Sequence, residues 1–266
     1  MQDNLIKVVF IADILGRPGR KLIFNHLDEV KNKFQPDFII ANIENIAGGF
    51  GITKKLMDEF IEKTEIDAYT TGNHVWDKKE FEINVNNYSN VLIPANYPDG
   101  VPGQRYIVLK KNNKTLGIIN LLGRALMGLN LDCPFRTAKK IVEKIKSETS
   151  SILIDFHAEA TSEKNALCFY LDGEVSAIIG THTHVQTADE RITEKGTAYI
   201  TDAGMTGVID SVIGYDEKNA ILKFLTQMPK KYEVKTKGIL EIQGVYLEIN
   251  HEGKAKKIER IKHRIS

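Results

Sequence analysis

The sequence contains only two cysteines, Cys133 and Cys168, and no C-x-x-C pattern. A secreted fold held together by disulfides needs several paired cysteines, so we expect two free thiols in a reducing compartment. The first residues lack a basic region followed by a long apolar stretch, and no run approaches the ~18 apolar residues that span a bilayer. We therefore predict a cytoplasmic protein that makes no membrane contact.

Excess charge of either sign is also missing, because 36 lysines and arginines nearly balance 35 aspartates and glutamates. Proteins that bind nucleic acid or anionic membranes through charge concentrate positive residues. The basic segment 254–264 is interrupted by Glu259, which favours an ordinary solvated face. The chain has no G-x-S-x-G motif either, which argues against a serine hydrolase.

Apolar strand-like runs alternate with amphipathic segments along the chain, which is typical of an α/β layered fold. Buried strands are predicted at 6–12, 37–43, 67–72, 151–156, 176–180 and 197–201. Helices are predicted within 16–34, 54–64, 77–87, 136–149, 162–173 and 216–228. Residues 104–122 predict a hairpin around an Asn-rich turn, and the tail from Tyr232 predicts antiparallel strands.

The final segment, 254–265, fits a helix by the spacing of its isoleucines and a strand by the turn before it, and we favour the strand. The sequence shows no linker, internal repeat or low-complexity tract. We therefore predict one domain over residues 1–266.

Polar side chains that can bind metals follow five of the predicted strands. In open α/β sheets, ligands bind beyond the carboxyl ends of the strands, so these side chains are expected at one sheet edge. In chain order they are Asp13, Glu44, Asn45, Asn73, His74, His157, His182 and His184. We expect residues 182–184 to be extended, so that His182 and His184 point the same way and can converge on one site.

Single members of this set have ordinary explanations. Asp13 could cap a helix, Asn73 could be a turn residue after a glycine, and His157 could be a core histidine with satisfied hydrogen bonds. Their joint occurrence argues otherwise, because burying carboxylates and imidazoles together is costly unless cations neutralise them. We therefore favour a metal site.

The same residues resemble the signature of calcineurin-like metallophosphoesterases, whose usual form is D-x-H, G-D, G-N-H, H and G-H-x-H. Two departures stand out, since Leu15 replaces the histidine of D-x-H and Glu44-Asn45 replaces G-D. With these departures, the segments TGNHVWDKKE, PANYP, FHAEATSEK and GTHTHVQTAD resemble the bacterial YmdB subfamily over nearly the whole chain. The resemblance implies a layered β-sandwich flanked by helices, in the order α/β/β/α.

The resemblance also implies a dinuclear metal centre in which Glu44 bridges two ions. One ion would be held by Asp13, Glu44, Asn45 and His184, and the other by Glu44, Asn73, His157 and His182. Imidazole and oxygen ligands without thiolates suit transition metals better than Ca²⁺ or Mg²⁺. We expect two divalent or trivalent ions. Iron is the preferred candidate, and manganese and zinc are the alternatives.

The activity implied by the resemblance is hydrolysis of phosphodiesters, in particular 2′,3′-cyclic nucleotides, with 3′,5′-cyclic nucleotides as a further candidate. A hydroxide bridging the two metals would attack phosphorus, as in other two-metal hydrolases. His74 would protonate the leaving oxygen, although it could instead only orient neighbouring groups. The rival from another class is a regulatory or scaffold protein whose metal centre is structural and which acts through a partner.

Two arginines near these motifs are candidate phosphate contacts, because guanidinium groups match phosphate oxygens. Arg17 follows Asp13, and Arg124 lies in the LLGR segment. An ordinary surface or structural role suits each of them equally well. The expected partner is a small phosphodiester or nucleotide, and the sequence leaves self-association open.

Overall fold

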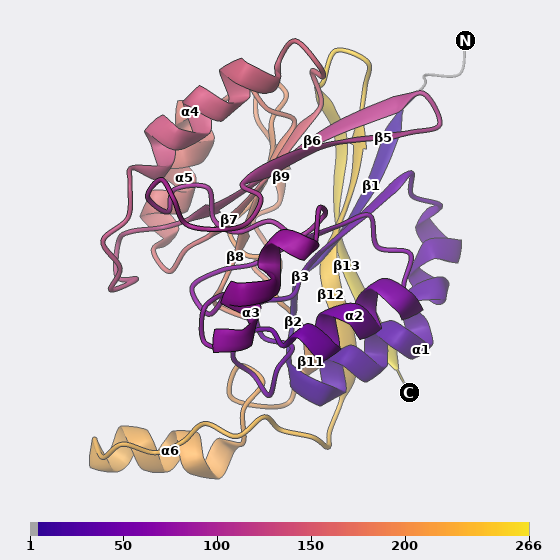
Figure 1. Ribbon diagram of the computed structural model, residues 1–266. Helices are drawn as coiled ribbons and strands as arrows, with labels where there is room; N and C mark the ends of the chain where they lie inside the picture. The colour runs from indigo at the N-terminus through magenta and orange to yellow at the C-terminus, as the bar shows by residue number, and fades with distance from the viewer. Residues whose placement is uncertain (1–4, 266) are drawn as a thin grey trace.

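The computed structural model describes residues 5–265 and arranges them as two β-sheets that face each other, with helices on both outer faces (Figure 1). The first sheet has the strand order β2-β11-β12-β1-β3-β4, and β13 pairs with β12. Its strands are β1 (Ile6–Ile11), β2 (Asp13–Ile14), β3 (Phe38–Asn42), β4 (Ala68–Thr70), β11 (Met205–Val208), β12 (Leu240–Ile249) and β13 (Ala255–Ile265).

The second sheet has the strand order β5-β6-β7-β8-β10-β9, and β6, β7, β8 and β10 run parallel to one another. Its strands are β5 (Tyr106–Lys111), β6 (Lys114–Leu122), β7 (Ile152–His157), β8 (Ala177–Thr181), β9 (Arg191–Ile192) and β10 (Ala198–Ile200). In β7 and β8 every residue is buried, as expected for parallel strands covered on both faces.

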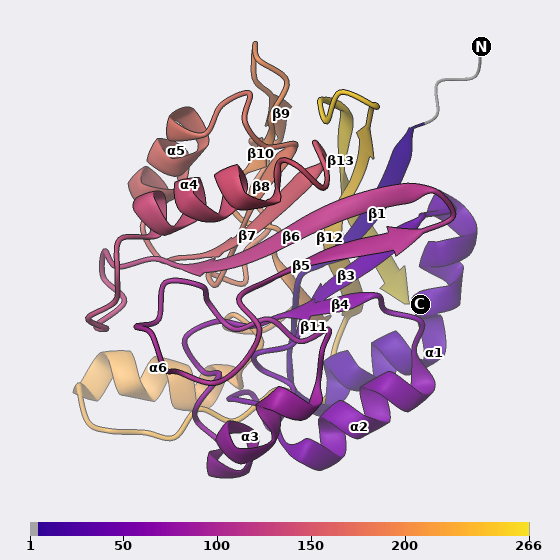
Figure 2. The ribbon, with the colours of Figure 1, turned by 45° about the horizontal axis from the view of Figure 1, so that its top comes forward.

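The helices divide between the two outer faces (Figure 2). α1 and α2 cover the first sheet, α4 and α5 cover the second, and α6 projects away from both. Their bounds are α1 (Gly16–Phe34), α2 (Lys54–Lys63), α3 (Lys79–Asn84), the 3₁₀ helix η1 (Val85–Asn87), α4 (Pro134–Ile145), α5 (Thr161–Tyr170) and α6 (Glu217–Thr226).

Alternation of side chains along the strands builds three separate apolar layers. Phe10 of β1 and Leu153 of β7 point between the two sheets and belong to the same buried cluster. The neighbouring residue Ile11 packs with α1, and Ile154 packs with α4 and α5. Successive strand residues face opposite sides of a sheet, so the residues of one apolar strand pack into two different apolar layers.

The predicted α/β/β/α arrangement of two sheets between helices is confirmed. The Asn-rich hairpin is also confirmed, with Asn112 and Asn113 at positive φ, and so is the strand chosen for the ambiguous last segment. The tail was expected to form strands from Tyr232, but β12 begins only at Leu240. The extent of the single domain stays a prediction.

Among residues 5–265, no helix combines the length and apolar character that crossing a bilayer requires.

Candidate metal centre

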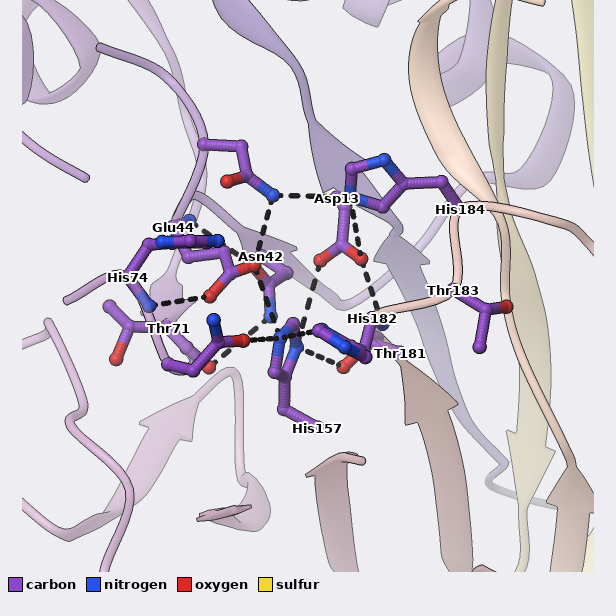
Figure 3. A network of polar contacts seen from close by, with 12 residues as sticks. Asp13, Asn42, Glu44, Thr71, His74, His157, Thr181, His182, Thr183 and His184 are labelled. Carbon is purple, nitrogen blue, oxygen red and sulfur yellow. Dashed lines mark hydrogen bonds and ion pairs between the residues drawn. The ribbon is translucent and has the colours of Figure 1, made fainter. Parts of the chain in front are cut away.

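The strand-end residues meet in one buried cluster between the two sheets (Figure 3). Asp13 begins β2, Glu44 lies just beyond β3, and His157 ends β7. These three side chains have no more than 1% of their surface exposed. The sheet topology therefore brings together residues that lie far apart in the sequence.

His157 is the centre of the first group of contacts. Its Nε2 atom lies 3.1 Å from Glu44 Oε1, 3.0 Å from Asn73 Oδ1 and 3.0 Å from His182 Nδ1. Glu44, His157 and His182 each offer a ligand atom, and these atoms all lie within 4.8 Å of one another. This spacing could hold a metal ion.

A second group of contacts surrounds His184. Its Nε2 atom lies 3.2 Å from Asn45 Nδ2 and 3.7 Å from Asp13 Oδ2. The same amide nitrogen of Asn45 donates to Glu44 Oε1 at 2.9 Å. Glu44 thus contacts both groups of residues. The expectation from the sequence was that each group holds one ion and that the Glu44 carboxylate bridges the two.

The outward nitrogen of His157 is held by a chain of hydrogen bonds. Asp155 Oδ1 accepts from the Thr181 hydroxyl at 2.7 Å, so that the hydroxyl oxygen is free to accept from His157 Nδ1 at 2.9 Å. Asp155 is fully buried and also accepts from Asn42 Nδ2 at 3.0 Å. The chain of bonds turns His157 Nε2 toward the cluster.

The other two imidazoles are held in the same way. His184 Nδ1 donates to the carbonyl oxygen of Ile213 at 2.9 Å, and His182 Nε2 lies 3.2 Å from Glu159 Oε2. Oxygen acceptors that fix the outer nitrogen of an imidazole are typical of metal-binding histidines, because they orient the ring and fix its tautomer. All three histidines therefore present their other nitrogen to the cluster.

Residues 182–184 do not have the extended conformation that the spacing of their histidines suggested. β8 ends at Thr181, and the φ angles of His182 and His184 are 105° and 63°. Such angles cost a non-glycine residue about 1–3 kcal/mol and persist only where the surroundings impose them. The two histidines converge because this bend turns them inward, and the prediction of an extended segment was wrong.

Two buried carboxylates hold this bend in place. Asp13 Oδ2 accepts from the backbone N–H of His182 at 2.9 Å, and Asp202 Oδ2 accepts from that of Thr183 at 2.9 Å. Lys164, fully buried, donates to Asp202 Oδ2 and to the Thr181 carbonyl, each at 2.9 Å. Removing one partner of such a pair typically costs about 3–5 kcal/mol, so the pair anchors the histidine segment firmly.

The electrostatics of the cluster favour a bound cation. Burial raises the pKa of Asp13 well above its ordinary value. Burial alone would raise the pKa of Glu44 and lower that of His157, but their mutual attraction outweighs it in both. The pKa of Glu44 therefore lies below its usual range, and that of His157 rises to about 9. Burial lowers the pKa of His182 to about 3, with repulsion from His157 adding to the effect.

Within the cluster, two buried oxygen atoms, Asp13 Oδ1 and Asn45 Oδ1, lack a hydrogen-bond partner among the described residues. Buried polar atoms are almost always paired, and a role in binding an ion is one of the usual reasons for an exception. Both atoms lie in the group around His184, where oxygen ligands outnumber nitrogen. Together with the inward-facing imidazoles, they make a donor set that fits transition-metal ions.

A pocket of about 290 Å³ opens onto this cluster. It is lined by Glu44, Asn45, Phe50, His74, Glu159, His182, Thr183, His184, Ile213 and Tyr215. None of these residues is a lysine or arginine, so a phosphate bound there would need another source of positive charge. Metal ions in the adjacent cluster would supply it.

The two arginines proposed as phosphate contacts do not line this pocket. Arg17 is exposed in the first turn of α1, and Arg124 lines a separate hollow beside Glu163. Their role in substrate binding stays a prediction.

The supporting residues Asp155, Lys164 and Asp202 were not predicted from the sequence. Two of them left a signal that could have been used. Asp155 is an acidic residue inside a buried strand, two positions before His157 and on the same side of that strand. Asp202 follows β10. β10 is therefore a further strand, beyond the five named in the sequence analysis, that is followed by a polar side chain at the same sheet edge.

Comparisons with known proteins agree with this picture. The model of the family described as "YmdB-like protein" matches residues 9–261. A protein of Bacillus subtilis (strain 168) named 2′,3′-cyclic-nucleotide 2′-phosphodiesterase is 46% identical over 257 residues, which cover 96% of each chain.

Two solved structures are similar along nearly the whole chain. The crystal structure of a novel phosphatase from Mycoplasma pneumoniae has a TM-score of 0.91 at 37% identity and covers 99% of this chain and 95% of its own. That of a hypothetical protein from Thermus thermophilus has a TM-score of 0.90 at 35% identity and covers 98% of this chain and 100% of its own.

Gly72 tests whether the packing of the cluster matters for metal binding. A Cβ atom at this position would collide with Glu44 Oε2 and with the His157 ring. We expect Gly72→Ala to weaken Mn²⁺ binding at least 10-fold in calorimetric titration, because it separates these two side chains.

The matched control for this substitution is Gly207→Ala. Gly207 lies in β11, and an added Cβ would meet no atom closer than 3.6 Å. The control should bind Mn²⁺ like the unaltered protein, and both variants should keep their circular dichroism spectrum. Equal Mn²⁺ affinity in the two variants would contradict a metal site at Glu44 and His157.

Proposed function

The chain belongs to the family of YmdB-like proteins, and on this premise we propose that it hydrolyses phosphodiesters, above all 2′,3′-cyclic nucleotides. The observation that carries the proposal is the convergence of Glu44, His157 and His182 beside an open pocket. The name of the Bacillus subtilis relative supports the substrate class. Hydrolysis of 3′,5′-cyclic nucleotides is a second candidate reaction of the same site.

The residues that would hold two metal ions fall into the two groups of contacts. Asp13, Asn45 and His184 would hold one ion, Asn73, His157 and His182 the other, and Glu44 both. When bound, such ions neutralise a phosphate and make a water molecule a better nucleophile near neutral pH. We propose iron as the native metal, with manganese or zinc as alternatives.

His74 is the proposed proton donor. Its Nδ1 atom lies 2.8 Å from Asp77 Oδ2, so that Nε2 is the nitrogen not engaged with this carboxylate. Phe50 packs against the ring at a centroid distance of 4.9 Å, and both residues line the pocket. Asp77 and Phe50 thus fix the orientation of the ring, and Nε2 would pass a proton to the oxygen that leaves phosphorus.

A pocket directly beside the cluster favours catalysis over a purely structural metal site. Structural metal sites are closed by protein ligands, whereas catalytic sites keep an open position. Here Glu44, His182 and His184 line the wall of the pocket. Action inside the cytoplasm remains a prediction from the sequence, which leaves self-association open.

Hydrolysis of a 2′,3′-cyclic nucleotide tests the proposed activity. We expect protein reconstituted with Fe²⁺ or Mn²⁺ to turn over this substrate, and His157→Ala to lose at least 100-fold in initial rate, because the central contact of the cluster disappears. His26→Ala is the matched control, since His26 lies in α1, contacts Glu29 and does not line the pocket. A metal-loaded, folded protein without turnover would rule out this substrate class.

The leaving group tests the role of His74. The ribose alkoxide that leaves a 2′,3′-cyclic nucleotide needs a proton, whereas nitrophenolate leaves bis(4-nitrophenyl) phosphate unaided. We expect His74→Ala to reduce the rate of hydrolysis of the cyclic nucleotide by about 10²- to 10⁴-fold. Hydrolysis of the nitrophenyl diester should slow by less than about 10-fold. Equal losses on both substrates would show that His74 only orients other groups.

A further inference from the structure

Glu159 is an acidic side chain in the pocket that neither metal group uses. We propose that Glu159 selects phosphodiesters over phosphomonoesters by placing a negative charge beside the bound phosphate. This inference rests on the proposed function and names the residue that restricts its substrates.

The position of Glu159 follows from the end of β7. It lies two residues after His157, ahead of α5, and its carboxylate lines the same pocket as Glu44 and His184. Glu159 Oε2 lies 3.2 Å from His182 Nε2, and 47% of the side chain is exposed. The carboxylate is therefore anchored at one atom while it faces the space that a substrate would enter.

No positive side chain offsets this charge among the residues that the structure describes. Neither lysine nor arginine lines the pocket, and the imidazole of His182 beside Glu159 is neutral near neutral pH, because its pKa is lowered to about 3. Glu44 and the histidines would hold metal ions, whose positive charge would attract monoesters and diesters alike. Glu159 adds a repulsion that grows with the charge of the ligand.

Phosphate esters differ in that charge. A phosphomonoester carries nearly two negative charges at neutral pH, since its second pKa is about 6, whereas a diester carries one. Glu159 lines the same pocket of about 290 Å³ as Glu44, His182 and His184, and charges within the ~8 Å Debye length at physiological salt are only partly screened from one another. The Glu159 carboxylate would therefore repel a phosphate bound beside these residues.

The same repulsion would act on the product. Hydrolysis of a 2′,3′-cyclic nucleotide opens one P–O bond of the ring by addition of water and leaves a phosphomonoester. The product thus gains the second negative charge at the moment when it must leave. Glu159 would then both exclude monoester substrates and promote product release.

A positioning role is the competing explanation, because the contact with His182 Nε2 could simply orient that ring. Glu159→Gln separates the two roles, since glutamine keeps an oxygen that can accept from His182 but loses the charge. Glu159→Ala removes both the acceptor and the charge. Glu194→Gln is the control, because it makes the same change of charge at an exposed residue between β9 and β10, outside the pocket.

The experiment compares 4-nitrophenyl phosphate with bis(4-nitrophenyl) phosphate on Mn²⁺-loaded protein. The two substrates share a leaving group and differ in charge. We expect Glu159→Gln to raise the ratio of kcat/KM for the monoester over the diester by about 3- to 10-fold, the size expected for a partly screened pair of like charges. The ratio should be unchanged in Glu194→Gln, and the effect should shrink at 0.5 M NaCl.

Calorimetric binding of 3′-AMP supplies a readout that does not depend on turnover. Glu159→Gln should bind this monoester about 3- to 10-fold more tightly than the unaltered protein. An unchanged ratio and an unchanged affinity in Glu159→Gln, with losses only in Glu159→Ala, would overturn the inference in favour of positioning. Should the unaltered protein hydrolyse neither ester, the proposed function fails, while the affinities for 3′-AMP still decide the role of Glu159.

Discussion

The imidazole rings of His157, His182 and His184 share one constraint, in that an oxygen acceptor holds the outer nitrogen of each and turns the other nitrogen inward. The inward nitrogens of His157 and His182 lie only 3.0 Å apart, beside the buried carboxylate of Glu44. Without an ion, this arrangement places a proton on His157, whose pKa rises to about 9. The site is built for positive charge, and metal ions can supply it.

The fold supports this constraint by placing rigid elements behind each ligand. Parallel strands end at one edge, so their last residues meet without long loops. The bend at His182 and His184 costs backbone strain, and the buried pair of Lys164 and Asp202 holds that bend against relaxation. Glycine at position 72 leaves just enough room for Glu44 and His157 to touch. Packing, backbone strain and charge therefore act on the same few atoms.

Most of the fold was predictable because its signals are local. Apolar runs gave the buried strands, and the polar residues after them gave the position of the site. The conformation of residues 182–184 was not predictable, because the positive φ of two histidines is imposed by Asp13 and Asp202 from distant parts of the chain. Lys164 was hidden for the same reason, since a lysine in an amphipathic helix gives no sign that it will be buried.

Anomalous X-ray diffraction from crystals grown with Mn²⁺ tests the central claim most directly, because it locates ions without reference to activity. The account predicts two anomalous peaks on opposite sides of the Glu44 carboxylate, one beside Asp13 and His184 and the other beside His157 and His182. Crystals that bind Mn²⁺ only outside this cluster would contradict the account. So would crystals in which these five side chains keep the positions described above with no ion between them.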